Sequence, residues 1–266
     1  MEETKLFKWS GAGNDFVVLD GRGKDVADFR TAPVISRLCS AYGTDGLIIL
    51  LESQERDFSM EFYNPDGTGG MMCGNGGRCI AAFASYLGLP GDHYVFDAPD
   101  GVHTADILSR EAPSRWEVRL GMADVSGVKD MLGGCFLDTG TRHFVKFVPD
   151  VENVDVAMEG RLYRWRQEFA PLGSNVNFVS PGPDGLRVRT FEKGVEGETL
   201  ACGTGITASA IAAFHRGIPP YRTGVSGRVE YRLQARISRL RVDFLPTEEG
   251  SFTGVFLTGP AELMDV

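Results

Sequence analysis

Two cysteines stand in near-identical glycine-rich stretches about 130 residues apart. Cys73 begins the run C-G-N-G-G, and Cys202 begins the run C-G-T-G. Glycine lets a ligand come close to the backbone, and a cysteine can take or give a proton. Such a turn at the start of a helix can therefore bind an anion and react with it.

The N-terminus of a helix carries unpaired N–H groups and about half a positive charge. It stabilises a thiolate and binds a carboxylate. Two such ends facing one carboxylate would place its neighbouring carbon between two sulfurs, so one thiolate could remove a proton while the other thiol delivers one to the opposite face. The stereocentre would invert. The pattern predicts an isomerase with Cys73 and Cys202 as its acid/base pair.

Helices are expected directly after both cysteines. Apolar residues recur at helical spacing over 74–87 and 203–216, which predicts two amphipathic helices. Further helices are predicted over 34–42, after Pro33, and around 150–158. Apolar alternation predicts the following strands: 6–9, 16–20, 47–51, 58–63, 93–96, 116–120, 136–138, 144–147, 176–179, 186–190, 225–231, 240–244 and 254–257.

The run before each cysteine is also repeated. Phe62 and Phe191 each stand 11 residues before their cysteine, at the end of a predicted strand, and a glycine-containing loop follows each. The repetition predicts an α+β fold of two similar lobes, each a mostly antiparallel curved sheet or barrel around a central helix. We place the boundary near Leu120, with residues 1–120 in one lobe, residues 121–254 in the other, and the active site in the cleft between them.

Composition excludes several classes of protein. The formal net charge of −9, without blocks of like charge, argues against nucleic acid as a partner. No apolar run is long enough for a membrane span, and the N-terminus lacks the pattern of a signal peptide, so we expect a cytoplasmic protein. Five cysteines without C-x-x-C, and four scattered histidines, argue against disulfides and a structural metal. Three cysteines are expected to be structural: Cys39, Cys79 and Cys135.

Five co-linear stretches carry a resemblance to a known family. They are SGAGNDF (10–16), YNPDG (63–67), MCGNGGRC (72–79), SNVNF (174–178) and GETLACGTG (197–205). In this order they resemble the diaminopimelate epimerases. The resemblance implies interconversion of LL- and meso-diaminopimelate by two cysteines without a cofactor, and a role in lysine biosynthesis. It also implies that residues 255–266 return to the first lobe.

The resemblance also assigns roles to single residues. Helix-end donors to the reacting carboxylate would come from Gly74, Asn75, Gly203 and Thr204. Asn14, Asn64 and Asn175 would orient the substrate. His143 and Glu192 would hold the reacting amino group or tune the thiols. Lys193 stands where the family commonly has an arginine for the distal carboxylate, and Arg142 could supply the missing guanidinium.

Other functions stay open on the sequence. The same chemistry could serve a racemase for another amino acid, or an isomerase related to proline racemase and phenazine-type enzymes. A dithiol redox module could pair Cys73 with Cys202 or Cys79, although the usual C-x-x-C spacing is missing. A nucleotide binder is disfavoured, because residues 11–16 match only part of the dinucleotide fingerprint. The expected partner is a small amino acid, and a homodimer is one option for assembly.

Overall fold

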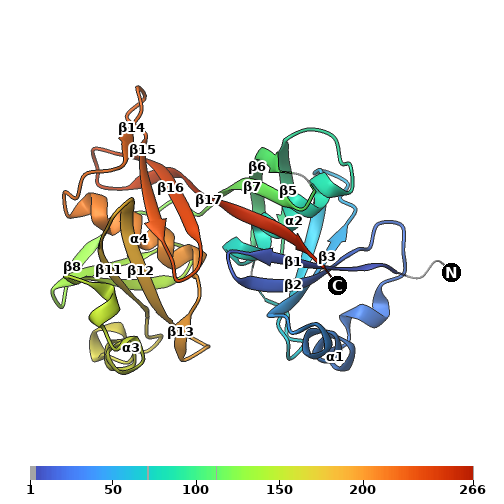
Figure 1. Ribbon diagram of the computed structural model, residues 1–266, viewed down its shortest axis with the longest axis horizontal. Helices are drawn as coiled ribbons and strands as arrows, with labels where there is room; N and C mark the ends of the chain where they lie inside the picture. Colours follow the sequence, from blue (N-terminus) through green and yellow to red (C-terminus); the bar gives the residue numbers. More distant parts are fainter. Residues whose placement is uncertain (1–3, 71, 112, 266) are drawn as a thin grey trace. The chain divides into compact units, whose positions relative to one another are not determined.

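The chain folds into two units, seen in the computed structural model of residues 4–70, 72–111 and 113–265 (Figure 1). The first, lobe 1, comprises the residues up to Leu120 and those from Gly259 on; the second, lobe 2, comprises Gly121–Thr258. Both lobes combine strands with a few helices. The predicted two-lobed α+β class is confirmed.

Lobe 1 is built on strands that close into a ring. Its strands are β1 (Leu6–Gly11), β2 (Asn14–Asp20), β3 (Gly46–Leu51), β4 (Phe58–Tyr63), β5 (His93–Ala98), β6 (Gly101–Glu111), β7 (Arg115–Gly121) and the end of β17 (Phe252–Met264). Each pairs with the next along the chain, β7 pairs with β17, and β17 pairs with β1. Buried and more exposed residues alternate along β1, β4 and β7, as expected when one strand face lines a core.

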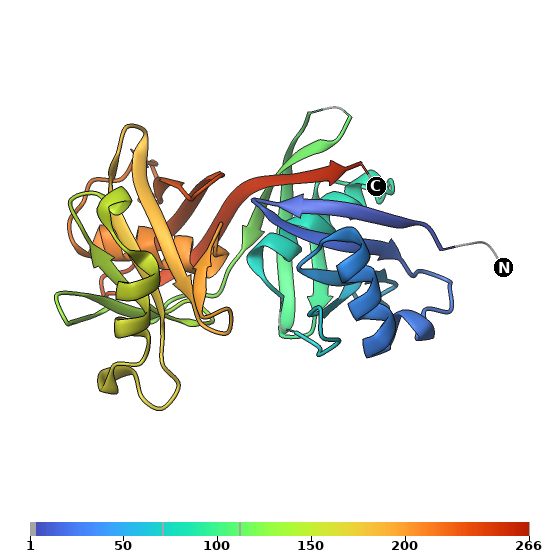
Figure 2. The same cartoon turned by 60° about the horizontal axis from the view of Figure 1, so that its bottom comes forward.

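One helix covers the outside of lobe 1 and one fills its inside. Helix α1 (Ala32–Tyr42), preceded by the 3-10 turn η1 (Ala27–Arg30), packs on β2 and β3 (Figure 2). It ends at Gly43, whose φ of 59° favours glycine. Helix α2 (Gly74–Tyr86) is buried from its first residue through Ala84. Strand β3 therefore has apolar neighbours on both faces, which explains its almost continuous burial.

Lobe 2 repeats this plan. Its strands are β8 (Lys129–Met131), β9 (Gly134–Asp138), β10 (Arg142–Phe147), β11 (Asn175–Gly182), β12 (Gly185–Glu192), β13 (Gly197–Thr199), β14 (Arg222–Thr223), β15 (Val229–Gln234), β16 (Arg239–Pro246) and the first part of β17. The outer helix is α3 (Val156–Arg164), flanked by the 3-10 turns η2 (Val151–Asn153) and η3 (Gln167–Phe169). The inner helix is α4 (Gly203–His215).

The order of strand pairings shows the duplication. From β1 to β6 the successive pairs are antiparallel, parallel, antiparallel, parallel and antiparallel. The series β9, β10, β11, β12, β15 and β16 has the same order. Helices α2 and α4 follow equivalent strands, β4 and β12. The sequence repeat around the two cysteines therefore reflects a repeat of the whole lobe.

Some predicted elements differ from the structure. The strand predicted over 225–231 begins only at Val229, because Gly224 and Gly227 close a turn through the hydrogen bond from Gly227 N–H to Gly224 O. The sequence predicted no strand at the positions of β6, β8, β13 and β14. The helix predicted around 150–158 begins as η2 and continues as α3. Helix α4 is not amphipathic but buried on nearly all sides, since its small residues admit strands all around it.

Candidate active site

Cys73 occupies the N-cap position of α2. Its backbone is extended, and its Sγ accepts a hydrogen bond from Gly76 N–H at 3.2 Å. A Cβ on Gly76 would lie 3.3 Å from that sulfur, so glycine leaves the sulfur room over the first turn. The thiol is half-buried. It lies where the unpaired N–H groups of the helix favour negative charge.

Polar side chains surround this helix start. Asn75 Nδ2 donates to Asn14 Oδ1, and Asn14 Nδ2 donates to Asp45 Oδ2 at 3.1 Å. Arg78, which is fully buried, donates from Nη2 to Asn75 Oδ1 at 2.8 Å. Two predicted residues, Asn14 and Asn75, are thus joined to each other. Asn64 lies directly after β4, and its Nδ2 donates to Thr68 Oγ1 at 3.0 Å within its own turn.

Cys202 occupies the equivalent N-cap position of α4. Its backbone is extended, and the residue is buried, with 8% of its surface exposed. Its Sγ lies 3.4 Å from Thr204 Oγ1. Thr204 Oγ1 in turn lies 3.0 Å from His143 Nε2 and 3.1 Å from Thr141 Oγ1. The second thiol therefore has a hydroxyl beside it and an imidazole one contact further away.

His143 lies in β10 and is fully buried. Asn177 Nδ2 lies 2.9 Å from His143 Nδ1, and Thr190 Oγ1 donates to Asn177 Oδ1 at 2.9 Å. This pattern makes Nδ1 an acceptor and leaves the ring proton on Nε2, facing the two threonine hydroxyls. Burial lowers the pKa of His143 to about 3. The ring is therefore neutral at physiological pH.

The remaining predicted residues line the ends of neighbouring strands. Asn175 pairs with His143 in the parallel ladder of β10 and β11. Its Oδ1 accepts from Lys193 N–H at 2.7 Å, and its Nδ2 donates to Arg142 O at 3.1 Å. Glu192 ends β12, and the side chain of Lys193 is exposed. Arg142 Nη1 donates to Phe169 O at 3.1 Å, which engages part of the guanidinium suggested for the distal carboxylate.

The structure thus joins Asn14 and Asn75 beside Cys73 in lobe 1, and Thr204 and His143 beside Cys202 in lobe 2, whereas the side-chain contact of Asn64 lies within its own turn. Sequence reasoning did not assign site roles to four of their contacts: Arg78, Asp45, Thr141 and Asn177. Arg78 had a detectable signal, because a charged residue interrupts an otherwise apolar helix. The three cysteines expected to be structural are buried, as predicted. Burial raises the pKa of the Cys79 thiol.

One group of possible metal ligands occurs among the described residues. Asp130, Cys135 and His215 place their ligand atoms within 4.8 Å of one another in lobe 2. Arg216 Nε donates to Cys135 Sγ at 3.2 Å, and Arg216 Nη2 lies 3.4 Å from Asp130 Oδ1. His215 Nε2 lies 3.1 Å from Asp130 Oδ2. The cluster therefore links the hairpin of β8 and β9 to the end of α4 by polar contacts of its own.

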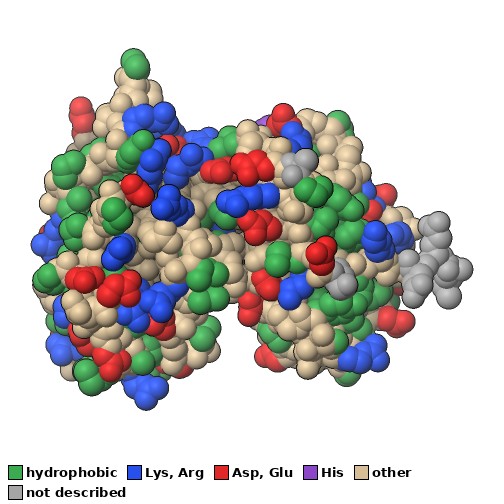
Figure 3. Space-filling view, in the orientation of Figure 1, with side chains coloured by type: hydrophobic (Ala, Val, Ile, Leu, Met, Phe, Trp, Pro, Cys, Tyr) green, Lys and Arg blue, Asp and Glu red, His purple; other side chains and the backbone are tan. Residues whose placement is uncertain are grey.

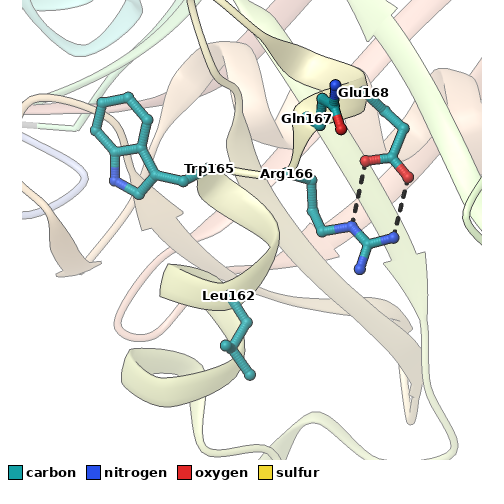
Figure 4. Close-up of a pocket in the computed structure, with 5 residues that line it drawn as sticks. All are labelled: Leu162, Trp165, Arg166, Gln167 and Glu168. Atoms are coloured by element: carbon teal, nitrogen blue, oxygen red, sulfur yellow. Dashed lines mark hydrogen bonds and ion pairs between the residues drawn. The ribbon is translucent and has the colours of Figure 1, made fainter.

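Other surface features lie apart from the predicted residues. A hollow of about 610 Å³ beside the end of α3 is lined by Leu162, Trp165, Arg166, Gln167 and Glu168 (Figure 4). It contains none of the residues predicted for the site. Basic and acidic side chains are interspersed over the face shown in Figure 3. Within the described chain, every helix is too short or too polar to span a membrane.

Known proteins of similar sequence share one name. The sequence model described as "Diaminopimelate epimerase" matches residues 6–125 and 135–228. A diaminopimelate epimerase of Flavobacterium psychrophilum is 39% identical over 264 residues, covering 98% of both chains. One of Chlorobaculum tepidum is 42% identical over 219 residues, covering 78% of this chain and 82% of its own.

Solved structures of much lower sequence identity share the fold. A PhzF-family phenazine biosynthesis protein of Bacillus anthracis superposes with a TM-score of 0.75 at 13% identity, covering 100% of this chain and 98% of its own. A probable proline racemase of Agrobacterium radiobacter gives a TM-score of 0.66 at 16% identity, covering 99% of this chain and 93% of its own. The sequence matches go further than the fold, and they bear out the resemblance carried by the five motifs. This chain belongs to the diaminopimelate epimerase family.

Proposed function

We propose that this chain interconverts LL- and meso-diaminopimelate, with Cys73 and Cys202 as the two acid/base groups. One observation carries the proposal: each thiol occupies the N-cap of a buried helix, at equivalent positions of a duplicated fold. Inversion at carbon by two opposed groups needs each of them to act as a base in one direction and as an acid in the other, which two thiols can do. Membership of the family supports diaminopimelate as the substrate.

The proposed step balances without an outside oxidant or reductant. One thiolate takes the proton from Cα and becomes a thiol. The electron pair of the broken C–H bond moves into the adjacent carboxylate. The electron pair then returns to Cα, which takes the proton of the opposite thiol on its other face, and that thiol becomes a thiolate. Both sulfurs must reach the same carbon in the substrate complex, which is a requirement of the proposal.

Backbone donors at the two helix starts would stabilise the developing charge. The N–H groups of Gly74, Asn75, Gly203 and Thr204 belong to the first turns of α2 and α4, where the positive end of the helix dipole favours an anion. Donors already fixed in place stabilise an anion without reorganising during the reaction. We assign the reacting carboxylate to these groups.

The other predicted residues would hold the rest of the substrate. We assign the amino group and distal half to Asn14, Asn64, Asn175, His143, Glu192 and Lys193. For Asn175 the contribution is indirect, because its amide already joins Lys193 N–H to Arg142 O. Lys193 would meet the distal carboxylate as a flexible point charge instead of a planar fork. The enzyme would serve lysine biosynthesis in the cytoplasm and use neither pyridoxal phosphate nor a metal.

Incubation with LL-diaminopimelate in heavy water tests these assignments together. The protein is first treated with a chelator and a carbonyl reagent, then assayed under anaerobic reducing conditions. We expect meso-diaminopimelate carrying deuterium at the inverted Cα. Deuterium exchange only into another amino acid, such as proline, would support the proposed reaction type but would contradict diaminopimelate as the substrate. A protein that exchanges no amino acid, as expected of a redox module, would contradict the proposal.

A further inference from the structure

Arg78 is a buried charge close to two thiols of lobe 1, those of Cys79 and Cys73. It lies in α2, five positions after Cys73, and is fully buried. Its guanidinium donates to three neutral oxygens: Nη1 to Gly74 O at 3.1 Å, Nη2 to Asn75 Oδ1 at 2.8 Å, and Nε to Pro260 O at 3.4 Å. Arginine is rarely buried without compensation, because its charge loses the stabilisation of water. Its hydrogen-bond acceptors are neutral, so its charge acts on the ionisable groups around it: the thiols of Cys79 and Cys73 and the carboxylate of Glu117 in β7.

Burial leaves Arg78 charged under working conditions. Its pKa is lowered to about 10 by desolvation, which is still far above neutral pH. By contrast, the buried Arg164 of lobe 2 forms an ion pair with Glu196 at 3.2 Å. Charges act more strongly through protein than through water, because the protein screens them less. A thiolate at Cys73, next to Gly74, would therefore be stabilised by this cation.

The same guanidinium orients two amides of the site. Arginine has no acceptor, so the atom of Asn75 that faces it must be the carbonyl oxygen. Asn75 Nδ2 is thereby turned to Asn14 Oδ1, and Asn14 Nδ2 to Asp45. The two amides are therefore fixed from both ends, because Arg78 donates to Asn75 and the Asp45 carboxylate accepts from Asn14. Loss of the guanidinium would remove the constraint at the end nearer to Cys73.

Lobe 2 offers a matched comparison within the molecule. Five positions after Cys202 stands Thr207, whose Oγ1 donates to Gly203 O at 3.0 Å. This bond is the counterpart of the one from Arg78 to Gly74 O. The duplicated position therefore keeps the hydrogen bond in both lobes but carries a charge in only one of them.

We infer that Arg78 is a positioning residue that makes Cys73 the more acidic of the two thiols, so that the resting enzyme holds a thiolate at Cys73 and a thiol at Cys202. The catalytic consequence of this inference rests on the proposed function, whereas its test measures only the acidity of the two thiols. In the resting state, the isomer whose Cα–H faces Cys73 would react at once. The other isomer would first need a proton to move between the sulfurs or through solvent.

The test measures the pH dependence of alkylation at each cysteine. Iodoacetamide reacts with the full-length protein without substrate, and peptide mass spectrometry follows Cys73 and Cys202 in the same sample. In the wild type we expect the midpoint for Cys73 at lower pH than that for Cys202. In Arg78→Met, alkylation of Cys73 at pH 7 should slow roughly tenfold while that of Cys202 stays the same.

Two further variants separate charge from geometry. Arg78→Lys should keep the low midpoint of Cys73 but raise KM, because a single ammonium cannot keep the three separate bonds to Gly74 O, Asn75 Oδ1 and Pro260 O that hold this helix start. Thr207→Val, which removes the counterpart bond in lobe 2 without a change of charge, should leave both midpoints in place.

The contrary outcomes are equally definite. Equal midpoints in the wild type, a lower midpoint for Cys202, or a parallel shift of both thiols in Arg78→Met would overturn the inference. If Arg78→Met does not fold, the order of the two alkylation midpoints in the wild type and the midpoint of Cys73 in Arg78→Lys still test the inference. Alkylation does not depend on turnover. If the protein exchanges no deuterium into diaminopimelate while the two alkylation midpoints still differ as expected, the result would count against the proposed function alone.

Discussion

The two helix starts share a backbone and differ in the side chains around their sulfurs. In lobe 1, Cys73 is half-buried, its Sγ accepts Gly76 N–H, and the cation Arg78 lies in the next turn. In lobe 2, Cys202 is more deeply buried and lies beside the hydroxyl of Thr204, with a neutral imidazole behind it. Both lobes keep a cysteine at the N-cap of a buried helix, a position that favours an anion, while the side chains beside the two sulfurs differ. The proposed reaction would thus use two equivalent sulfurs in unlike surroundings.

Removal of either sulfur should have the largest effect. We expect Cys73→Ala and Cys202→Ala each to slow epimerisation by about a thousandfold or more, since a positioned acid/base group contributes roughly 10²–10⁴. Each variant keeps one base, so each should still exchange deuterium into one stereoisomer, and the two variants should prefer opposite isomers. Cys39→Ala, which changes a buried cysteine of α1, is the matched control and should keep its activity. Full epimerisation by either active-site variant would show that the lobes do not share the reaction.

The hydroxyl of Thr204 should matter for one thiol only. A hydrogen bond to a charged group contributes about 1.5–3 kcal/mol, which corresponds to roughly 10- to 150-fold in rate. We expect Thr204→Val to lower kcat/KM within that range and to move the alkylation midpoint of Cys202 to higher pH, because the hydroxyl 3.4 Å away stabilises its thiolate. Thr204→Ser should restore both values. If the midpoint of Cys73 moved as well, the two sites would not be tuned independently.

His143 should make stability depend on pH through lobe 2. Its folded pKa of about 3 lies below the ordinary value of 6.5, so below pH 6.5 the unfolded chain binds a proton that the folded ring refuses. This difference should lower the free energy of unfolding by about 2 kcal/mol between pH 7.5 and pH 5, at ~1.4 kcal/mol per pH unit. Urea unfolding of the wild type and of His143→Gln at both pH values measures this loss of unfolding free energy, which we expect only in the wild type. An equal loss in the two proteins would mean that the buried ring takes up a proton in the folded state.

Local patterns predicted the elements, but long-range contacts decided the site. The two cysteines, their helices and the strands before them follow from glycine turns and apolar spacing within single segments. The tautomer of His143 depends on Asn177 and Thr190, which come from two other strands, β11 and β12. The role of Arg78 depends on Asn14 and Asp45 through Asn75, and no local pattern shows that link. The burial of α4 on nearly all sides was also missed, since alanine fits an amphipathic and an enclosed helix equally well.

The glycines two positions after the first helical residue provide the mildest test of the difference between the lobes. A Cβ on Gly205 would lie 2.4 Å from Asn177 Oδ1 and 3.3 Å from His143 Cε1, whereas one on Gly76 would lie 3.3 Å from both Cys73 Sγ and Ile48 Cδ1. Gly205→Ala must displace an amide held by three hydrogen bonds, so we expect it to lower the free energy of unfolding by about 1–3 kcal/mol. Gly76→Ala needs a shift of only a few tenths of an ångström, and the higher helix propensity of alanine, worth ~1 kcal/mol, should largely offset it. Urea unfolding of both variants gives the comparison. Equal losses would mean that the imidazole network packs no more tightly against its helix than the sulfur of Cys73 does against its own.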